Sequence, residues 1–272
     1  MIRFLTLASS SAGNAALLSW GGQHLLIDAG ISCLRIRKSL AALGLSMDDL
    51  SALLITHAHN DHIAALSTMV RRHAVPIYAT AETARQIAYR VAGAEPLLRP
   101  FSAGSSLEIG GFFVSSFPTS HGIPGSAAYR IDCGGRSLGL LTDTGIVPQG
   151  AERLMGVDLL VLEANHDVEM LRGGPYPYAL KERVLGRWGH LSNAAAAQFA
   201  REAALHGTGD IILAHLSQEN NTPRAALETV SAALEPVGYG GRLTVAPRDA
   251  PCEPHLLEES TCSVLPSSAL ES

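Results

Sequence analysis

Four side chains that can bind a metal ion lie within six consecutive residues of the chain. They are His57, His59, Asp61 and His62, and they follow an apolar run at residues 53–55. Residues two apart in an extended segment point to the same side, so His57 and His59 face one way, while Asp61 and His62 lead into a predicted helix. Imidazole and carboxylate ligands together suit Zn, Mn or Fe, and the absence of cysteine among them argues against a structural zinc site. The segment predicts a metal site at the end of a strand.

Three further ligand candidates each follow a separate apolar run. These residues are His121, Asp143 and His215. One such residue at a strand end is more often a cap or a hydrogen-bonded core group than a ligand. Three of them beside a segment that already holds four ligands favour a metal centre, because the ends of neighbouring strands gather polar side chains at one edge of a sheet.

The elements that must position these residues can be predicted from short apolar runs and turn signals. Strands are expected at residues 2–7, 15–19, 24–27, 53–55, 76–79, 107–109, 112–116, 127–131, 138–142 and 159–163, and helices at 34–43, 63–72, 81–91, 179–185, 193–204 and 223–234. Two strand-rich parts with helices after them predict an α/β protein, a four-layer α/β/β/α sandwich. We expect one domain over residues 1–248. Residues 249–272 are rich in Pro, Ser and Glu, and we expect them to form a disordered tail.

Composition excludes several classes of protein. The 272 residues are 47% hydrophobic and 17% charged, which is a globular composition, and the formal charge of −5 excludes a protein that binds polyanions over its whole surface. Apolar runs are too short for a membrane helix, and the N-terminal segment predicts a strand rather than a signal peptide. The four cysteines have no CxxC spacing, which indicates free thiols in a reducing compartment. We therefore expect a cytoplasmic protein without a membrane partner.

The segment THAHNDH, the upstream string LLIDAG and the three later ligand candidates resemble the metallo-β-lactamase-fold hydrolases. The match spans roughly residues 1–247. Within that superfamily the strings SSSAGN, TDTG, EANHDVEMLRGGPYP, GHLSN and AHLSQENN are similar to the YycJ (WalJ) group of small nuclease-like proteins. These are cytoplasmic bacterial proteins that resemble 5′ exonucleases acting on DNA. The resemblance implies a metallo-β-lactamase-type sandwich and a metal-dependent phosphodiester hydrolase.

The resemblance also implies roles for the ligand candidates. One metal ion would be bound by His57, His59 and His121, the other by Asp61, His62 and His215, and Asp143 would bridge the two. The ions would be Zn or Mn, with Fe as an alternative. Such a pair can hold a hydroxide between the ions for in-line attack on phosphorus. Asp28 would orient the ligands without binding an ion itself, although an Asp-Ala-Gly turn after a strand explains an aspartate at this position equally well.

Other residues have less defined roles. By resemblance to tRNA 3′-processing nucleases, Glu163 and His190 would form a proton-donating pair, although His190 could instead simply precede the helix cap at Ser192. His166 could enter the site and Asp167 could bind or orient, but simple loop structure explains both. The residues that could contact nucleic acid mix basic and aromatic side chains, and a solvated helix face is the alternative for all of them: Arg172, Tyr176, Tyr178, Lys181, Arg183, Arg187 and Trp188.

We predict a metal-dependent DNA exonuclease of 5′ to 3′ polarity, in which Asp61, Glu163 and His190 take part in catalysis. The alternative is a thioester or lactone hydrolase, because the same scaffold and ligands serve acyl transfer. A tRNA-processing enzyme remains open, but the chain has no long inserted arm. The complete ligand set argues against a binding module without activity. DNA is the expected partner, and the amphipathic helices leave a homodimer open.

Overall fold

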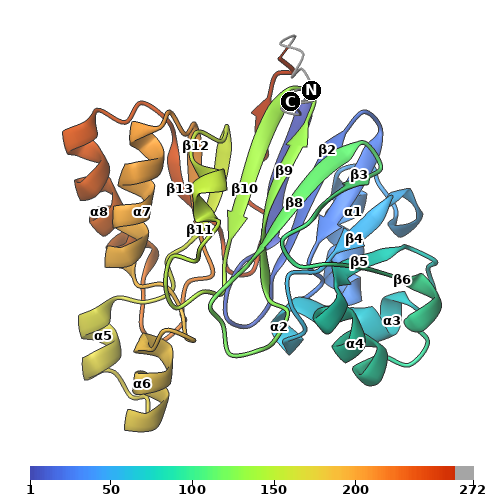
Figure 1. The fold of residues 1–272 in the computed structure, drawn as a ribbon, viewed down its shortest axis with the longest axis horizontal. Helices are drawn as coiled ribbons and strands as arrows, with labels where there is room; N and C mark the ends of the chain where they lie inside the picture. The colour runs from blue at the N-terminus through green and yellow to red at the C-terminus, as the bar shows by residue number, and fades with distance from the viewer. Residues whose placement is uncertain (261–272) are drawn as a thin grey trace, which may run out of the picture.

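Short apolar strands separated by glycine turns form two sheets of seven strands, and the computed structural model describes residues 1–260 (Figure 1). The first sheet has the spatial order β14-β1-β2-β3-β4-β5-β6. Its strands are β1 (Ile2–Ala8), β2 (Ala15–Trp20), β3 (Gln23–Ile27), β4 (Ala52–Leu54), β5 (Ile77–Thr80), β6 (Leu98–Phe101) and β14 (His255–Leu257). From β3 to β6 neighbouring strands are parallel.

The second sheet has the order β13-β12-β11-β10-β9-β8-β7. Its strands are β7 (Ser106–Ile109), β8 (Phe112–Pro118), β9 (Ala127–Cys133), β10 (Arg136–Leu141), β11 (Leu159–Glu163), β12 (Asp210–Ala214) and β13 (Leu243–Val245). The strands β10 to β13 are parallel to one another. Strand β8 has the same direction as β10, because both are antiparallel to β9. The carboxyl ends of β8, β10, β11 and β12 therefore meet at one edge.

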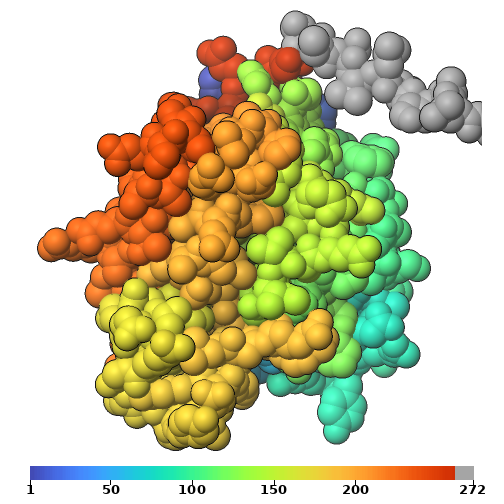
Figure 2. Space-filling model, turned by 60° about the vertical axis from the view of Figure 1, so that its left-hand side comes forward, coloured from blue at the N-terminus to red at the C-terminus, as the bar shows by residue number. Residues whose placement is uncertain are grey.

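Helices cover the outer faces of both sheets. The helices are α1 (Cys33–Ala42), α2 (Asn60–Ile63), α3 (Leu66–Met69), α4 (Ala81–Arg90), α5 (Val168–Gly173), α6 (Tyr178–Leu185), α7 (Asn193–Leu205) and α8 (Pro223–Leu234), with 3-10 turns η1 (Met47–Asp49), η2 (Glu95–Leu97), η3 (Ala151–Leu154) and η4 (Glu235–Val237). In Figure 1, α2, α5 and α6 lie at the end of the sandwich away from the N-terminus. Figure 2 shows α5 and α6 as a lobe at its lower left. None of the helices among residues 1–260 is both long and apolar enough to span a membrane.

Three apolar clusters fill the spaces between the four layers. Phe4, Tyr129 and Val161 belong to the cluster between the two sheets. A second cluster joins the first sheet to α1, α3 and α4, and a third joins the second sheet to α7 and α8. The predicted α/β/β/α sandwich is confirmed, because each sheet has one face toward the other sheet and one toward helices.

The helix predicted over residues 63–72 is wrong in its bounds, and hydrogen bonds explain the difference. In a continuous helix the carbonyl of Asp61 would accept from the amide of Ala65. Here the Asp61 carbonyl accepts from the Asn14 amide at 2.8 Å, and the Ala65 amide donates to the Ala29 carbonyl at 2.9 Å. The segment therefore breaks into α2 and α3, and the break fixes the metal-competent residues against the loops after β1 and β3.

The expected disordered tail is also wrong over part of its length. Strand β14 pairs antiparallel with β1, with Phe4 opposite His255, and the Cys252 amide donates to the Thr6 carbonyl at 2.9 Å. His255 is buried, whereas Leu256 points outward. A strand of three residues added to a sheet edge is too short to produce a recognisable alternating pattern. The rest of the expected tail, residues 261–272, lies outside the described residues.

Candidate metal centre

All seven predicted ligands meet at the carboxyl ends of the strands. Three residues there, Asp28, Asp143 and His215, have φ angles of 58°, 57° and 58°, and they are the non-glycine residues with positive φ among residues 1–260. Each follows the last residue of a strand or comes one position later. This left-handed conformation costs roughly 1–3 kcal/mol per residue and persists only where the surrounding structure imposes it. The backbone is therefore strained at three points that all serve one site.

Three histidine nitrogens converge in what we call the three-histidine cluster (His57, His59 and His121). His57 Nε2 lies 2.9 Å from His59 Nδ1, and His121 Nε2 lies 3.1 Å from the same atom. The opposite nitrogens have partners of their own, since His57 Nδ1 lies 3.1 Å from the Thr56 hydroxyl and His121 Nδ1 lies 3.1 Å from the Gly189 carbonyl. Burial lowers the pKa of all three rings, that of His59 to about 4. Neutral rings leave these nitrogens free to bind a metal ion.

A second group, the mixed cluster, consists of Asp61, His62 and His215. Asp61 Oδ2 lies 3.4 Å from His62 Nε2 and 3.5 Å from His215 Nε2. The other nitrogens face carboxylates, because His62 Nδ1 lies 2.7 Å from Asp28 Oδ2 and His215 Nδ1 lies 3.0 Å from Glu163 Oε1. Carboxylate partners of this kind fix the tautomer so that Nε2 points at a metal ion. Asp28 thus contacts a candidate ligand at the position that the resemblance implies.

Asp143 lies between the two clusters. Its Oδ2 is 3.3 Å from His62 Nε2, and its Oδ1 is 3.6 Å from His215 Nε2 and 3.8 Å from His121 Nε2. Asp143 Oδ2 and His215 Nε2 are buried without a hydrogen-bond partner, which is costly for polar atoms. The orphaned atoms and the nitrogen and carboxylate donors fit divalent metal ions, and the position of Asp143 suits a ligand shared between two of them.

Charge is distributed differently in the two clusters. Burial alone would lower the pKa of His62 and His215, but the carboxylates around them outweigh it: Asp28 and Asp143 raise the pKa of His62, and Asp143 and Asp61 raise that of His215 to about 10. Burial would conversely raise the pKa of Asp61, but hydrogen bonds to the two histidines lower it. Without metal ions the mixed cluster therefore balances its carboxylates with protonated histidines, whereas the three-histidine cluster stays neutral.

The predicted proton-donating pair is assembled beside Asp143. His190 Nδ1 lies 2.8 Å from Glu163 Oε1, and Glu163 Oε2 accepts from the amides of Thr144 at 2.9 Å and Leu191 at 3.1 Å. Burial would raise the pKa of Glu163, but the charge of His190 and hydrogen bonds to His190 and His215 hold it at about 2. Glu163 is therefore an acceptor only, so His190 must carry a hydrogen on Nδ1. Nε2 of His190 remains as the atom that can exchange a proton.

Thr56 and Gly30, for which no role was predicted, also shape the site, as does Asn14. The Thr56 hydroxyl lies 2.9 Å from Asp28 Oδ2 and 3.2 Å from His62 Nδ1. Its place immediately before His57 was the available signal. Asn14 Nδ2 lies 3.1 Å from His62 Nε2. A Cβ on Gly30 would lie 1.6 Å from the Asp61 carbonyl oxygen, so glycine is required where the loop after β3 meets α2.

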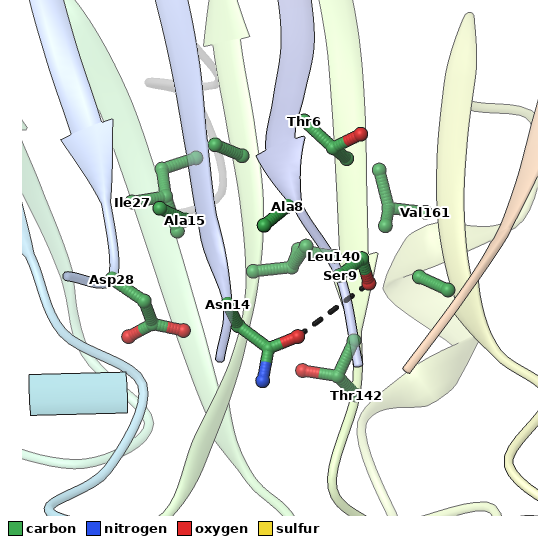
Figure 3. A pocket seen from close by; sticks show the side chains of 12 residues that line it. Thr6, Ala8, Ser9, Asn14, Ala15, Ile27, Asp28, Leu140, Thr142 and Val161 are labelled. Carbon is green, nitrogen blue, oxygen red and sulfur yellow. Dashed lines mark hydrogen bonds between the residues drawn. The ribbon is translucent and has the colours of Figure 1, made fainter. Parts of the chain in front are cut away.

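The loop Ser9–Asn14 closes the site from the other side. Ser9 Oγ accepts from the His215 amide at 2.8 Å, and the Gly30 amide donates to the Asn14 carbonyl at 2.7 Å. Behind this loop a cavity of about 30 Å³ lies between the sheets. Figure 3 shows its polar end, formed by Ser9, Asn14, Asp28 and Thr142. This volume holds about one or two water molecules.

His166 and Asp167 differ in what the structure assigns to them. Asp167 caps α5, because its carboxylate accepts from the amides of Glu169 at 3.0 Å and Met170 at 2.9 Å. His166 is buried, both its ring nitrogens lack a hydrogen-bond partner, and burial lowers its pKa to about 4. It therefore lies in the protein as a neutral ring without a hydrogen bond to the predicted ligands.

Five of the residues predicted to contact nucleic acid lie on the α5 and α6 lobe, namely Arg172, Tyr176, Tyr178, Lys181 and Arg183, whereas Arg187 and Trp188 follow α6. Arg172 forms an ion pair with Glu169 at 3.4 Å, and Lys181 donates to the Arg172 carbonyl at 2.6 Å. Arg183 is exposed, and Tyr176 is half-buried. Lys181 thus ties the two helices of the lobe together, while the guanidinium groups remain at the surface.

A family model described as a β-lactamase superfamily domain matches residues 23–216. The chain belongs to this superfamily. Among curated relatives, Exodeoxyribonuclease YycJ of Bacillus anthracis is 36% identical over 242 residues, which cover 88% of this chain and 91% of the relative. Exodeoxyribonuclease WalJ of Streptococcus pneumoniae is 35% identical over 247 residues, covering 88% and 90%. The predicted resemblance to the YycJ/WalJ group is confirmed.

A solved structure shares the fold. The metallo-β-lactamase fold protein YhfI from Bacillus subtilis matches with a TM-score of 0.70 and 20% identity, and the match covers 93% of this chain and 99% of that one. The superfamily, the relatives and the clustered histidine and aspartate side chains identify this member as a metal-dependent hydrolase.

Proposed function

We propose that the protein is an exodeoxyribonuclease that hydrolyses DNA from a 5′ end with two divalent metal ions. The observation that carries the proposal is the position of Asp143, whose two oxygens face both clusters at 3.3 to 3.8 Å. The names of two relatives that are 35–36% identical support DNA as the substrate. The 5′ polarity rests on the resemblance to their group.

The clusters divide the ligands between two ions, Zn or Mn. His57, His59 and His121 would hold one ion, Asp61, His62 and His215 the other, and Asp143 both. When bound, the ions supply a water-derived nucleophile at neutral pH and positive charge opposite the phosphate oxygens. The chain itself contributes orientation, because partners on the far nitrogens of His57, His62, His121 and His215 direct each ring.

His190 is the proposed proton donor to the leaving oxygen. Glu163 accepts the Nδ1 hydrogen of His190 and so presents Nε2 to the site. Asp143 Oδ1 lies 3.8 Å from His190 Nδ1, which places the donor next to the proposed bridging ligand. In this proposal Glu163 and His190 transfer a proton, while the residues of the two clusters and Asp143 hold the ions.

DNA would approach between the Ser9–Asn14 loop and the α5 and α6 lobe. The loop borders the mixed cluster through Ser9 and Asn14, which suits recognition of a terminal phosphate. The guanidinium groups of Arg172 and Arg183 and the ring of Tyr176 would contact the strand beyond it. This path requires only a local basic surface, consistent with a chain of net charge −5 and with action on DNA in the cytoplasm.

The test is a degradation assay on DNA labelled at the 5′ or the 3′ end, with Mn, Zn or no added metal. RNA, a thioester and a lactone are run in parallel, and His59→Ala is the inactive control. Early release of the 5′ label, dependent on metal and absent in the variant, is the expected result. Release from the 3′ end overturns the polarity. Turnover of the thioester or lactone with inert DNA overturns the substrate class.

A further inference from the structure

Helix α4 (Ala81–Arg90) lies beside the three-histidine cluster but contributes no ligand to it. The three histidines come from two loops, with His57 and His59 after β4 and His121 after β8. Figure 1 shows α4 at the same end of the sandwich as α2, which begins directly after His59. The two loops must be held at a fixed separation if the three ring nitrogens are to bind one ion. Any bond from α4 to these loops therefore bears on the metal centre.

The amino end of α4 is bonded to the loop that follows His121. The hydroxyls of Thr80 and Thr83 both donate to the Gly125 carbonyl, at 2.8 and 3.1 Å. Both threonines are fully buried. Gly125 has a φ of +87°, and a Cβ there would lie 2.6 Å from the Glu82 Cβ and 2.8 Å from the Thr80 hydroxyl oxygen. The loop can therefore approach the helix this closely only because residue 125 is glycine.

Two further bonds come from the middle and the carboxyl end of α4. Gln86 Nε2 donates to the Pro124 carbonyl at 2.9 Å. A guanidinium nitrogen of Arg90 donates to the carbonyl of Ala58, the residue between the first two histidines of the cluster. Helix α4 thus holds one loop along its amino half and the other loop at its last residue. Because a helix is a stiff element with a rise of about 1.5 Å per residue, it sets the distance between the two loops.

The backbone bond from Arg90 matters most for His59. Nδ1 of His59 faces the other two rings of its cluster, and Nε2 has no hydrogen-bond partner in the described part of the chain. The mixed cluster differs, because carboxylates of Asp28 and Glu163 face the far nitrogens of its histidines. With no partner of that kind, the direction of the His59 ring depends on its backbone, and Arg90 holds the carbonyl of the preceding residue, Ala58.

We propose that α4 acts as a clamp that sets the geometry of the three-histidine cluster. The clamp residues are Thr80, Thr83, Gln86 and Arg90, and they are positioning residues that act through backbone carbonyls of the two loops. This inference rests on the proposed function, because it takes the three-histidine cluster to hold one of the two ions. Loss of clamp bonds lets the loops move relative to each other, so this ion binds less tightly. The ion in the mixed cluster keeps its ligands and their partners.

The experiment titrates zinc into the metal-free full-length protein by calorimetry and follows two binding phases. The double variant Gln86→Ala/Arg90→Ala should weaken one phase by about 10- to 100-fold, as loss of supporting hydrogen bonds typically does, and leave the other within about threefold of wild type. His121→Ala, which removes a ligand, identifies the phase that belongs to the three-histidine cluster. Arg85→Ala is the matched control, because Arg85 lies on the same helix but pairs with Glu82 at 2.8 Å.

A pair of substitutions at Thr83 tests the buried end of the clamp. Thr83→Val removes the hydroxyl and keeps the shape of the side chain, so it should weaken the same phase, whereas Thr83→Ser keeps the hydroxyl and should retain most of the affinity. Wild-type affinity in the double variant, or equal weakening of both phases, overturns the inference. A wild-type protein that binds two ions but cleaves no DNA contradicts the proposed function, while the zinc titrations still decide the inference.

Discussion

The three-histidine cluster and the mixed cluster face each other across Asp143, yet they reach their geometry in different ways. The first contains rings that burial keeps neutral, with partners that are a hydroxyl and a backbone carbonyl. The second holds histidines whose far nitrogens face Asp28 and Glu163, and its rings are protonated without metal. The neutral histidines of the first cluster can bind an ion directly, whereas the histidines of the mixed cluster must lose protons when an ion binds. The two halves of one centre therefore need not bind metal with equal ease.

Asp143→Ala should have the largest effect, because the Asp143 carboxylate faces the Nε2 atoms of both clusters. We expect activity to fall by at least about a thousandfold and metal content to drop, since the shared ligand is lost. Metal analysis and kcat on the same preparation provide the check. A variant with full metal content and normal kcat would show that the two clusters do not work together.

His190 belongs to neither cluster, so His190→Ala should separate catalysis from metal binding. We expect a loss of roughly 10² to 10⁴ in kcat, typical of a proton donor, with metal content close to wild type. If metal content falls as far as it does in Asp143→Ala, His190 is a part of the metal site and not a donor.

Asp28→Asn should weaken the mixed cluster more than the three-histidine cluster, because Asp28 contacts His62 directly and His57 only through Thr56. It removes the charge that faces His62 Nδ1 but leaves the His57, His59 and His121 nitrogens in place. Loss of such a supporting carboxylate typically weakens metal affinity by about 10- to 100-fold. In a calorimetric titration of the metal-free protein, one of two binding phases should weaken. Equal weakening of both phases would contradict the independence of the clusters.

The smallest expected effect is a difference between the two clusters in how metal binding depends on pH. His215 has a pKa raised to about 10, so at pH 7 an ion entering the mixed cluster must displace protons, and affinity should rise with pH. His59 has a pKa lowered to about 4, so the three-histidine cluster should release none at pH 7. Titrations in buffers of different ionisation enthalpy count the protons. Equal proton release in both phases would contradict the assignment.

The raised pKa of His215 also predicts how the stability of the metal-free protein changes at alkaline pH. A histidine whose folded pKa is raised stabilises the fold fully below its unfolded value near 6.5 and loses that contribution as pH rises through about 10. The free energy of unfolding should therefore decrease between pH 7 and pH 10, as urea denaturation can measure. Bound metal should remove this decrease, because the ion replaces the proton.

Much of this centre could be predicted because its residues follow strands in a recognisable pattern. The segment THAHNDH and the single residues His121, Asp143 and His215 come directly after apolar runs, and parallel strands bring such ends together. The break between α2 and α3 could not be predicted, because it depends on hydrogen bonds to distant parts of the chain. The Asn14 amide donates to Asp61, and the Ala29 carbonyl accepts from Ala65. Strand β14 was missed for a related reason, since only its partner β1 makes it a strand.

The position of Trp188 was equally hard to predict. Sequence placed it in a basic and aromatic stretch with Arg172 and Lys181, but the structure uses Lys181 to join α5 to α6 and puts Trp188 in a groove beside His121. The contact through the Gly189 carbonyl joins segments 68 residues apart. Such placement follows from packing and not from spacing.

The requirement for two metal ions is tested most directly by adding Mn or Zn back to the metal-free protein. Activity on 5′-labelled single-stranded DNA and the number of bound ions are measured at each step. We expect little activity until the three-histidine cluster and the mixed cluster are both filled, and full activity at two ions per chain. Full activity with one ion per chain, or with none, would contradict it.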